Sequence, residues 1–552
     1  MKKELILTFT FLLLISTVLM AQTLEWQWAA QASGTGYDCG RDIAVDEYGN
    51  TYVTGFFSDT AIFGLHTLTS DGYFDIFVAK MDATGNWLWA TKAGGDNFDG
   101  GLGIAIHNGY CYVSGAFVNS ATFGPYSLIS NGDDDVFVAK IDTNGNWLWV
   151  IQAGGSNVDG SNDIVVDENS NCYVTGMFKD TATFGSHSLS SNGEFDIFVA
   201  KADANGNWLW ATKAGGSSID YSEAIGIDDY GNSYVTGNFY ESATFGSYSL
   251  TSNEYFDVFI AKLDADGNWL WATHAGGCGN DRSYAIAIDE NSNSYVAGNF
   301  YGSATFGDNT VISIGDADIF ISKMDTDGNW LWATNAGGSS NDVGRAIAID
   351  DYDNCYIGGH FQETVTFGSH SLVSAGESDV YVAKLNANGN WLWARKAGGN
   401  SEDCCYAVAI DDNGNSYSTG FFSGIATFGS YTLTSTNTWD RNVFVAKLGY
   451  DTSVDNHVIP INIKLSNYPN PFNPSTTIEF SMQNDSNVEL NIFNIRGQKI
   501  KTLTHNEFTK GDHSVIWNGD DESNNPVSSG IYYYILKIND NAEAVKKCLL
   551  LK

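Results

Sequence analysis

The chain has 552 residues and a formal net charge of −38, from 65 acidic and 27 basic residues spread along its length. Phosphate binding needs clustered Lys and Arg, so this balance argues against a nucleic-acid partner. The 59 glycines and the aromatic content of 14% suit many short strands joined by tight turns, and they do not suit disorder.

The N-terminus has the order of an export signal. Lys2 and Lys3 precede an apolar run over residues 5–20, which ends before Ala21. This predicts a signal peptide over residues 1–21, cleaved after Ala21. The alternative is an uncleaved membrane anchor, for which the run is shorter than the roughly 20 residues of a span.

Seven Trp-x-Trp pairs recur at a spacing of 60 or 61 residues, which indicates one repeated supersecondary unit. Each repeat holds four short strand-like runs, for example 285–289, 295–300, 319–323 and 330–334. A four-stranded antiparallel unit of this length is the size of a β-propeller blade. The pairs are Trp26/Trp28, Trp87/Trp89, Trp147/Trp149, Trp208/Trp210, Trp269/Trp271, Trp330/Trp332 and Trp391/Trp393.

The register of the repeats is broken at the two ends. The strand at 26–29 precedes the first inner strand, whereas the last repeat stops after 444–447 without a Trp-x-Trp strand of its own. Pairing the first strand with the last repeat would close the ring and leave no exposed sheet edge. The sequence therefore predicts an all-β fold, a seven-bladed β-propeller over residues 22–450 closed by the N-terminal strand.

The pattern Asp-x-x-Gly-Asn-x-Tyr-Val-x-Gly, followed by Phe-Val-Ala-Lys-x-Asp-x-x-Gly-Asn-x-Leu-Trp, resembles the seven-bladed β-propeller repeat of bacterial secreted proteins. The resemblance covers about residues 22–450. It implies the architecture and an extracytoplasmic habitat, but no single chemistry.

One acid recurs in every repeat, just before the innermost strand, and in a closed ring these acids would encircle one mouth. They could form a carboxylate crown that binds a cation such as Ca²⁺, or each could accept backbone N–H groups of its own loop. Perfect repetition favours the structural role, and no cofactor is otherwise predicted. The seven are Asp38, Asp99, Asp159, Asp220, Asp281, Asp342 and Asp403.

Two other repeated features have the same pair of interpretations. A second acid precedes the third strand at Asp75, Asp135, Asp196, Asp257, Asp318 and Asp379, with Asn442 at the matching place in the last repeat. Turns such as DATGN (82–86) resemble calcium loops but lack the bidentate Glu and the full spacing. Both are expected to be structural, as are the Trp pairs, whose alternative is a sugar-stacking platform.

Departures from the repeat are better candidates for a binding site on the propeller rim. His107 replaces the Asp that ends the innermost strand elsewhere, and Arg41, Arg282 and Arg345 lie in loops leading into that strand. If they meet in one cleft with an acid, catalysis is favoured; if they scatter, it is not. No Ser-His-Asp, Cys-His or metal-ligand spacing stands out, so no catalytic residue is predicted.

Cysteine positions suggest one cross-link. Cys39 and Cys404 each follow a crown aspartate, on blades that should be neighbours at the closure, so a disulfide there would lock the ring. Cys405 competes for the same role, and the distance between blades could be too large for a bridge.

Composition shifts after residues 451–464, which are expected to be a linker. Alternating runs between 476 and 551 then predict a small immunoglobulin-like β-sandwich over residues 465–552. This segment resembles the type A sorting domain of the type IX secretion system of Bacteroidota. The resemblance rests on Tyr468, Pro469, Asn470, Pro471, Gly497, Gly530, Lys546, Lys547 and Lys552 within their motifs. It implies an address read by the type IX export machinery, the alternative being an ordinary structural module.

Three functions remain open. The leading hypothesis is a secreted or cell-surface protein that binds a glycan or protein without catalysis. The second is an enzyme that uses the propeller channel, either a polysaccharide-active hydrolase or lyase or a quinoprotein-like dehydrogenase. The third is a structural component of a surface layer.

Overall fold

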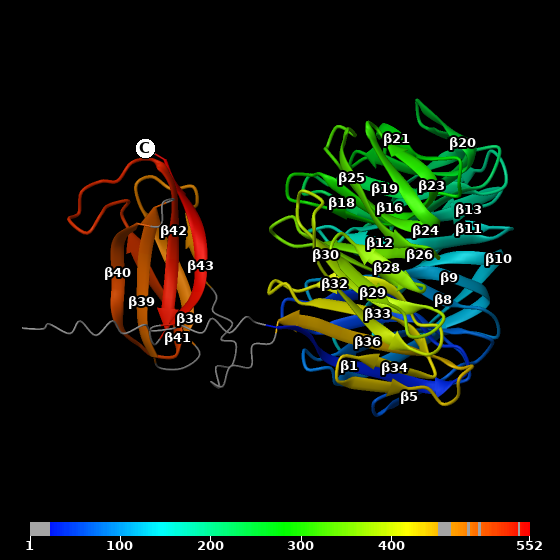
Figure 1. The fold of residues 1–552 in the computed structure, drawn as a ribbon, viewed down its shortest axis with the longest axis horizontal. Helices are drawn as coiled ribbons and strands as arrows, with labels where there is room; N and C mark the ends of the chain where they lie inside the picture. Colours follow the sequence, from blue (N-terminus) through cyan, green and yellow to red (C-terminus); the bar gives the residue numbers. More distant parts are fainter. Residues whose placement is uncertain (1–22, 451–464, 483–485, 495–497, 539–540, 552) are drawn as a thin grey trace, which may run out of the picture. The chain divides into compact units, whose positions relative to one another are not determined.

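A computed structural model describes residues 23–450, 465–482, 486–494, 498–538 and 541–551. The chain divides into two compact parts, Met1–Thr452 and Ser453–Lys552. The expected signal peptide (1–21) and linker (451–464) lie outside the described residues. All named elements are β-strands (Figure 1). Across the described ranges, no helix is long and apolar enough to span a membrane.

Each of the seven sequence repeats folds into an antiparallel group of four strands, called a repeat unit below. The first strands of the units are β2 (Cys39–Val45), β8 (Gly100–His107), β12 (Asp159–Val166), β18 (Asp220–Ile227), β22 (Arg282–Ile288), β26 (Asp342–Ile349) and β32 (Cys404–Ile410). The second strands are β3 (Thr51–Phe57), β9 (Tyr110–Phe123), β13 (Cys172–Phe178), β19 (Ser233–Phe245), β23 (Ser294–Phe306), β27 (Cys355–Phe361) and β33 (Ser416–Ser423).

The outer half of each unit repeats in the same way. The third strands are β6 (Asp75–Met81), β10 (Tyr126–Ile141), β16 (Asp196–Ala202), β20 (Tyr248–Leu263), β24 (Asn309–Met324), β30 (Asp379–Leu385) and β36 (Arg441–Tyr450). The fourth strands are β7 (Trp87–Gly94), β11 (Trp147–Gly155), β17 (Trp208–Gly216), β21 (Trp269–Gly277), β25 (Trp330–Gly338), β31 (Trp391–Gly399) and, for the last unit, β1 (Leu24–Thr35).

A hairpin between the second and third strands of each unit pairs with the end of the fourth strand of the unit before it. In four units the hairpin consists of separate strands, β4 (Thr60–Phe63) with β5 (His66–Thr69), β14 (Thr181–Phe184) with β15 (His187–Ser190), β28 (Thr364–Phe367) with β29 (His370–Val373), and β34 (Ile425–Phe428) with β35 (Tyr431–Thr434). In the other three it continues β9/β10, β19/β20 and β23/β24. This pairing joins neighbouring units by backbone hydrogen bonds.

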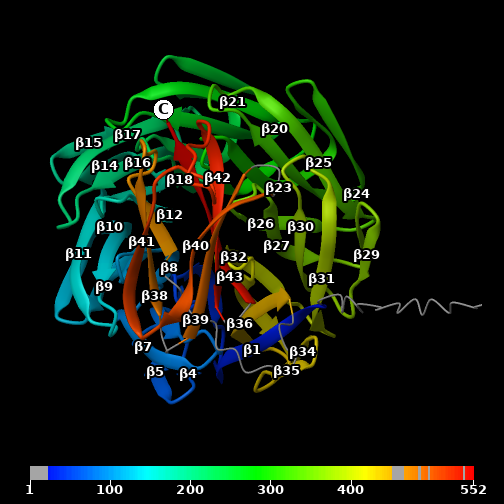
Figure 2. The ribbon, with the colours of Figure 1, turned by 90° about the vertical axis from the view of Figure 1, so that its left-hand side faces the viewer.

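The ends of the first part meet as the register of the repeats predicts. β1 pairs with β36 along most of its length, from Leu24 opposite Tyr450 to Ala32 opposite Val443. The first strand of every unit packs against the first strand of the next, and β32 packs against β2. Figure 2 shows the chain colours running round a circle until β1 lies beside β36. The first part is therefore an all-β, propeller-like fold.

Each Trp-x-Trp pair connects three consecutive units. The Nε1 of Trp28 donates to the carbonyl of Ala83, 3.1 Å away in the turn of the next unit, and Trp89 does the same with Thr143 at 2.9 Å. In four pairs the first indole donates in the opposite direction, as Trp87 Nε1 does to the carbonyl of Gln31, 3.2 Å away in the preceding unit. These contacts fit the interpretation that the indoles pack between units. They do not favour the alternative that the indoles are a platform for sugar stacking.

The Gly-Asn turns are shaped by these indoles. Gly85 has φ of 88°, and a Cβ added there would lie 2.9 Å from the ring of Trp28. Asp82 Oδ1 accepts the backbone N–H groups of Thr84 and Asn86 at 2.9 and 3.0 Å, which closes the turn without an ion. The glycine is thus required both by its backbone angle and by the neighbouring unit.

The second part consists of two sheets around one core. β37 (Leu465–Tyr468), β38 (Thr476–Met482) and β41 (Gly511–Trp517) form one sheet, and β40 (Lys499–Phe508), β39 (Ser486–Asn494), β42 (Gly530–Ile538) and β43 (Asn541–Leu550) form the other. Ile478, Leu490, Trp517 and Tyr534 from both sheets are buried together. The arrangement is a small β-sandwich.

We expect removal of residues 22–35 to abolish cooperative thermal unfolding, because β36 would become an exposed sheet edge and the partners of Trp26 and Trp28 would lose their cover. Circular dichroism and calorimetry measure this effect. A synthetic peptide of residues 22–35 added in trans should restore the transition. A chain that ends at Tyr450, and so lacks only the second part, is the control. Unchanged melting of the N-terminal truncation would contradict the role of β1.

Candidate functional site

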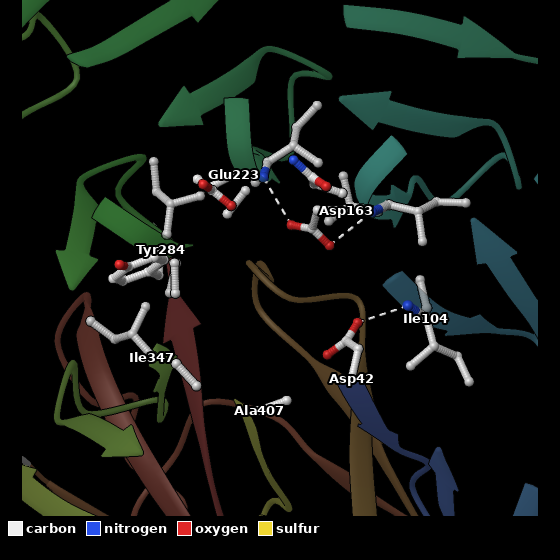
Figure 3. A pocket seen from close by; sticks show the side chains of 18 of the residues that line it. Asp42, Ile104, Asp163, Glu223, Tyr284, Ile347 and Ala407 are labelled. Atoms are coloured by element: carbon white, nitrogen blue, oxygen red, sulfur yellow. Dashed lines mark hydrogen bonds between the residues drawn. The ribbon is translucent and has the colours of Figure 1, made fainter. Parts of the chain in front are cut away.

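A cavity of about 510 Å³ is lined by the first strands of all seven repeat units. Figure 3 shows residues from different units converging on it, among them Asp42, Asp163, Glu223 and Tyr284. The volume is in the range of small-ligand pockets. The lining combines aliphatic side chains along the strands with a polar and aromatic rim.

Each first strand has a register shift at the same place, and the extra residue lines this cavity. A β-bulge of this kind re-aims one side chain without ending the strand. In β2 the shift falls between Gly40 and Asp42, and in β32 between Cys405 and Ala407. The seven bulged residues, called the bulge ring below, are Arg41, Leu102, Asn162, Glu223, Tyr284, Arg345 and Tyr406.

The bulge ring varies from unit to unit, although the surrounding sequence repeats. Its seven members are of five residue types, whereas three positions earlier every repeat has Asp. A residue that only maintains the fold is needed in every unit, so it repeats. A ligand is asymmetric and needs different side chains at different positions round the ring. The variation therefore marks the bulge ring as the candidate site.

Four members of the bulge ring form a continuous cation-aromatic row. The guanidinium of Arg41 lies 4.5 Å from the ring centre of Tyr406, and that of Arg345 lies 5.5 Å from the same ring. Arg345 also lies 4.1 Å from the ring centre of Tyr284. Such contacts hold flexible cations in a defined position.

Glu223 provides negative charge in the same cavity. Its burial raises its pKa, an effect opposed by the positive charges of Arg345, Arg41 and Arg282. Asn238 Nδ2 lies 3.5 Å from its Oε1. The carboxyl group therefore lies within the electrostatic field of all three arginines.

Asp42 and Asp163 follow two bulged residues and connect neighbouring first strands. Asp42 accepts the N–H of Ile43 at 2.8 Å and that of Ile104 in β8 at 2.7 Å (Figure 3). Asp163 accepts the N–H groups of Ile164 at 2.7 Å and Ile225 in β18 at 2.9 Å. Burial raises the pKa of Asp42 to about 6, and burial together with the charge of Asp42 raises that of Asp163 to about 8. The carboxylate oxygens of Asp42 and Asp163 thus already accept hydrogen bonds from the backbone.

Two of the four predicted rim residues, Arg41 and Arg345, line the cavity. Arg282 is exposed, lies over the ring of Phe256 at 5.5 Å, and reaches the cavity only through its charge. The sequence analysis missed Tyr284, Tyr406, Glu223 and Asn162. Comparing the residues three positions after each crown aspartate would have found them.

His107 does not line the cavity. It ends β8 next to a tight turn in which Asn108 and Gly109 have φ of 51° and 78°. In other units the Asp at this place pairs with a lysine, as Asp228 does with Lys262 at 3.6 Å. In the second unit Lys140 instead stacks on Tyr110, 4.2 Å from its ring centre. The histidine therefore stands where a shorter turn replaces the Asp-containing turn of the other units.

The crown aspartates are engaged by backbone N–H groups. Asp99, for example, accepts the N–H groups of Gly95 at 2.7 Å and Val118 at 3.0 Å, and all seven are 0–1% exposed. Within the described ranges, no group of three acidic, histidine or cysteine side chains is placed to hold a metal. Each crown carboxylate is thus buried and bonded to backbone, which fits the structural role; the cation-binding alternative stays a prediction.

The second repeated acid approaches the crown acid of the next unit. A Cβ on Gly276 would lie 2.4 Å from Asp257 Oδ1 and 2.9 Å from Asp281 Oδ2, so both carboxyl groups flank one glycine. Asp257 Oδ1 is buried without a hydrogen-bond partner. Burial and the charge of Asp281 raise the pKa of Asp257 to about 7. Asn442 replaces this acid in the last unit.

The expected Cys39–Cys404 disulfide is absent, because both thiols are free and buried, and Cys405 is free as well. Phe421 packs with Cys39 and Cys404 in one small cluster. Burial raises the pKa of Cys39 to about 12. Packing thus replaces the cross-link.

In the second part, the structure brings two pieces of the expected sorting signal together. Phe472, which follows Pro471, bonds through its N–H and carbonyl to Leu549 and Leu551 at 2.9 Å each. Asn470 Oδ1 accepts the N–H of Leu549 at 2.9 Å. Tyr468, Lys546 and Lys547 are exposed, and Gly530 begins β42. Gly497 and Lys552 lie outside the described residues.

Comparisons with known proteins support the coarse architecture. A family model described as beta-propeller repeat matches residues 27–55, and one described as FlgD Ig-like domain matches residues 472–541. The chain is 24% identical over 534 residues to the uncharacterized WD repeat-containing protein L264 of Acanthamoeba polyphaga mimivirus, covering 78% of this chain and 38% of that protein. The chain thus spans well under half the length of that relative.

Two solved structures resemble the chain at low sequence identity. The WD40 β-propeller domain of Doa1 is 12% identical with a TM-score of 0.38, and the match covers 78% of this chain and 98% of that one. PorZ, a surface component of the type IX secretion system of Porphyromonas gingivalis, is 12% identical with a TM-score of 0.25, covering 94% and 74%. The repeat match and the strand order together indicate a propeller-like fold.

The buried acid pairs predict an unusual pH dependence of stability. Because these pKa values are raised above that of an unfolded aspartate, the folded chain keeps protons that the unfolded chain has lost. The free energy of unfolding should therefore fall as the pH rises from about 4.5, just above the pKa of an unfolded aspartate, to about 8, just above the folded pKa, by at most about 1.4 kcal/mol per pH unit for each such carboxyl. Asp257→Asn, which copies Asn442, should stabilise the protein at the upper pH and reduce the slope.

Urea unfolding at the two pH values measures both effects. Asp264→Asn is the matched control, since that turn aspartate is only partly buried and its hydrogen bonds to Asn268 and to backbone N–H groups lower its pKa. Equal destabilisation by Asp257→Asn at both pH values would contradict the interpretation of the acid pair.

Proposed function

We propose that this chain is an exported, non-catalytic binding protein in which a seven-bladed β-propeller holds a small polar ligand in its axial cavity. The pairing of β1 with β36 and the circular contacts of the first strands support the closed propeller. The observation that carries the binding role is the bulge ring. It places one side chain from every unit, of five residue types in all, at one cavity of about 510 Å³.

The chemistry of the lining favours binding over catalysis. Among the described residues, the cavity contains no His, Cys, Ser or Lys. The oxygens of Asp42 and Asp163 accept backbone N–H groups, so these carboxylates stabilise the ring. Arginine and tyrosine side chains suit recognition of a polar ligand. The cavity is small, so a glycan end or a small molecule fits this proposal better than a protein surface.

A polysaccharide hydrolase is the second candidate, and one observation favours it. Glu223, Asp42 and Asp163 bring three carboxyl groups with raised pKa values to the cavity. Paired carboxyl groups of this kind are the usual catalysts of glycoside hydrolysis. The binding proposal requires that a bound oligosaccharide remain intact.

For the second part of the chain we propose the role of a secretion address. Its sequence resembles type A sorting domains, and its contacts join Asn470 and Phe472 to the C-terminal strand. The signal-like N-terminus, over residues 1–21, supports export across the first membrane. We infer that the protein reaches the outer surface or the medium through the type IX machinery.

The binding role is tested by blocking the cavity. Ala285→Phe adds a ring to a cavity-lining position, and it should abolish binding of the mature chain to any ligand found on a glycan and surface-protein array. Leu65→Phe is the control, because Leu65 is 98% exposed. Equal binding by the blocked variant would place the ligand elsewhere. Release of cleaved products, stopped by Glu223→Gln, would instead support the hydrolase.

The secretion address is tested with a reporter in a host that has the type IX system. A periplasmic reporter fused to residues 453–552 should appear at the cell surface or in the medium. The same fusion without residues 530–552 lacks β42 and β43 and should stay in the periplasm. Immunoblots of fractionated cells measure the distribution. Periplasmic retention of the complete fusion would contradict the proposed address.

A further inference from the structure

Within the described residues, the arginines in and near the cavity form no direct ion pair with a carboxylate of the protein. Across the described part of the chain, no carboxylate lies within ion-pair distance of Arg41, Arg282 or Arg345. The Nε of Arg345 is buried and has no hydrogen-bond partner. In a chain with a net charge of −38, carboxylates are abundant, so unpaired arginines at one cavity are informative. Buried donors are normally satisfied, which indicates a partner from outside the chain.

A second unpaired group lies in the same corner. His360 Nδ1 is buried without a hydrogen-bond partner. Burial and the neighbouring charge of Arg345 lower the pKa of His360 to about 3, so its ring is neutral and adds no competing positive charge. The corner around Arg345 therefore combines one cation with two unmet hydrogen-bonding atoms.

The guanidinium of Arg345 suits a planar anion. Arg345 and Arg41 lie 5.5 and 4.5 Å from the ring centre of Tyr406, which belongs to the unit between theirs, so the three side chains form a row along one side of the cavity. A guanidinium presents its N–H groups as a rigid fork that matches a carboxylate in bidentate fashion. Tyr284 extends the aromatic surface beyond Arg345.

The other members of the bulge ring suit hydroxyl groups rather than a second anion. Glu223 and Asn162 line the cavity in the units that follow Arg41 round the ring. A carboxylate and an amide accept hydrogen bonds from sugar hydroxyls, and tyrosine rings pack against the apolar face of a sugar. The ring is thus asymmetric, with cations on one side and hydrogen-bond acceptors on the other.

We infer that the cavity binds a carboxylated sugar of the hexuronic acid class. Arg345 binds its carboxylate, Arg41 adds positive charge on the same side of the cavity, Tyr284 and Tyr406 pack against the ring, and Glu223 and Asn162 accept hydrogen bonds from its hydroxyl groups. This assignment rests on the proposed binding function and names its ligand.

Calorimetric titration of the mature full-length chain tests the assignment. A digalacturonate and a glucuronate-containing disaccharide are compared with the matched neutral disaccharides, in which the carboxylate is a hydroxymethyl group. We expect the acidic sugars to bind at least about tenfold more tightly, because charged hydrogen bonds exceed neutral ones in strength. Arg345→Gln should weaken acidic-sugar binding about 10- to 100-fold, and Arg41→Gln should weaken it by a smaller factor, because Arg41 contributes only its charge. Both variants should weaken neutral-sugar binding less than they weaken acidic-sugar binding.

Two further variants keep the result interpretable if a glutamine variant unfolds. Arg345→Lys retains the charge without the fork and should give intermediate affinity. Arg395→Gln is the matched control, since Arg395 lies in the outer strand β31 and bonds to the carbonyls of Leu24 and Ala394. Thermal midpoints verify that each variant is folded.

Equal binding of acidic and neutral sugars, no effect of the arginine variants, or binding of sulfated sugars alone would overturn the assignment. If none of the acidic probes binds but an array ligand does and is lost in Ala285→Phe, the binding function stands and the hexuronic acid class is wrong. If no ligand shows sensitivity to Ala285→Phe, the proposed function fails together with the assignment.

Discussion

The whole first part depends on the contacts that the Trp-x-Trp pairs make between neighbouring repeat units, called the tryptophan clasp below. Four of the first indoles donate to the unit before them, as Trp87 does to Gln31, and six of the second indoles donate to the unit after them, as Trp28 does to Ala83. A unit of four short strands cannot bury both faces alone, so its stability comes from its neighbours. The clasp between the last and first units exists only because β1 supplies the missing strand. The two chain ends are thereby joined without a covalent bond.

Closure by packing explains why a disulfide is unnecessary. Cys39 and Cys404 lie in one buried cluster with Phe421, and hydrogen bonds of β1 to β36 and of β1 to β4 cross the junction. The same constraint shapes the turns, because Gly85 lies against the indole of Trp28 and cannot accept a side chain. The residues that repeat in this protein are therefore those that every unit needs for its contacts with the next.

The candidate site is built from the bulged residues of the first strands, which do not take part in these repeated contacts between units. A bulge in each first strand directs one side chain toward the cavity and away from the contacts between units, so that position is free to vary. The acid pairs show the opposite case. They repeat because their backbone hydrogen bonds are part of every loop, even though burial of two carboxyl groups beside each other raises their pKa values. Structural and binding residues are separated by repetition and variation within a single chain.

The printed sequence by itself determined the four-strand repeats, the pairing of the first strand with the last repeat, and the strands of the C-terminal sandwich. These follow from local periodicity, turn residues and the register of the tryptophan pairs. It also pointed to Arg41 and Arg345, which break the repeat. Only the tertiary structure decided that Tyr284, Tyr406 and Glu223 join them, and that His107 belongs to a shorter turn. The reason is physical: a bulge shifts which residue faces the cavity, and that shift becomes visible only when each strand is paired with its partner.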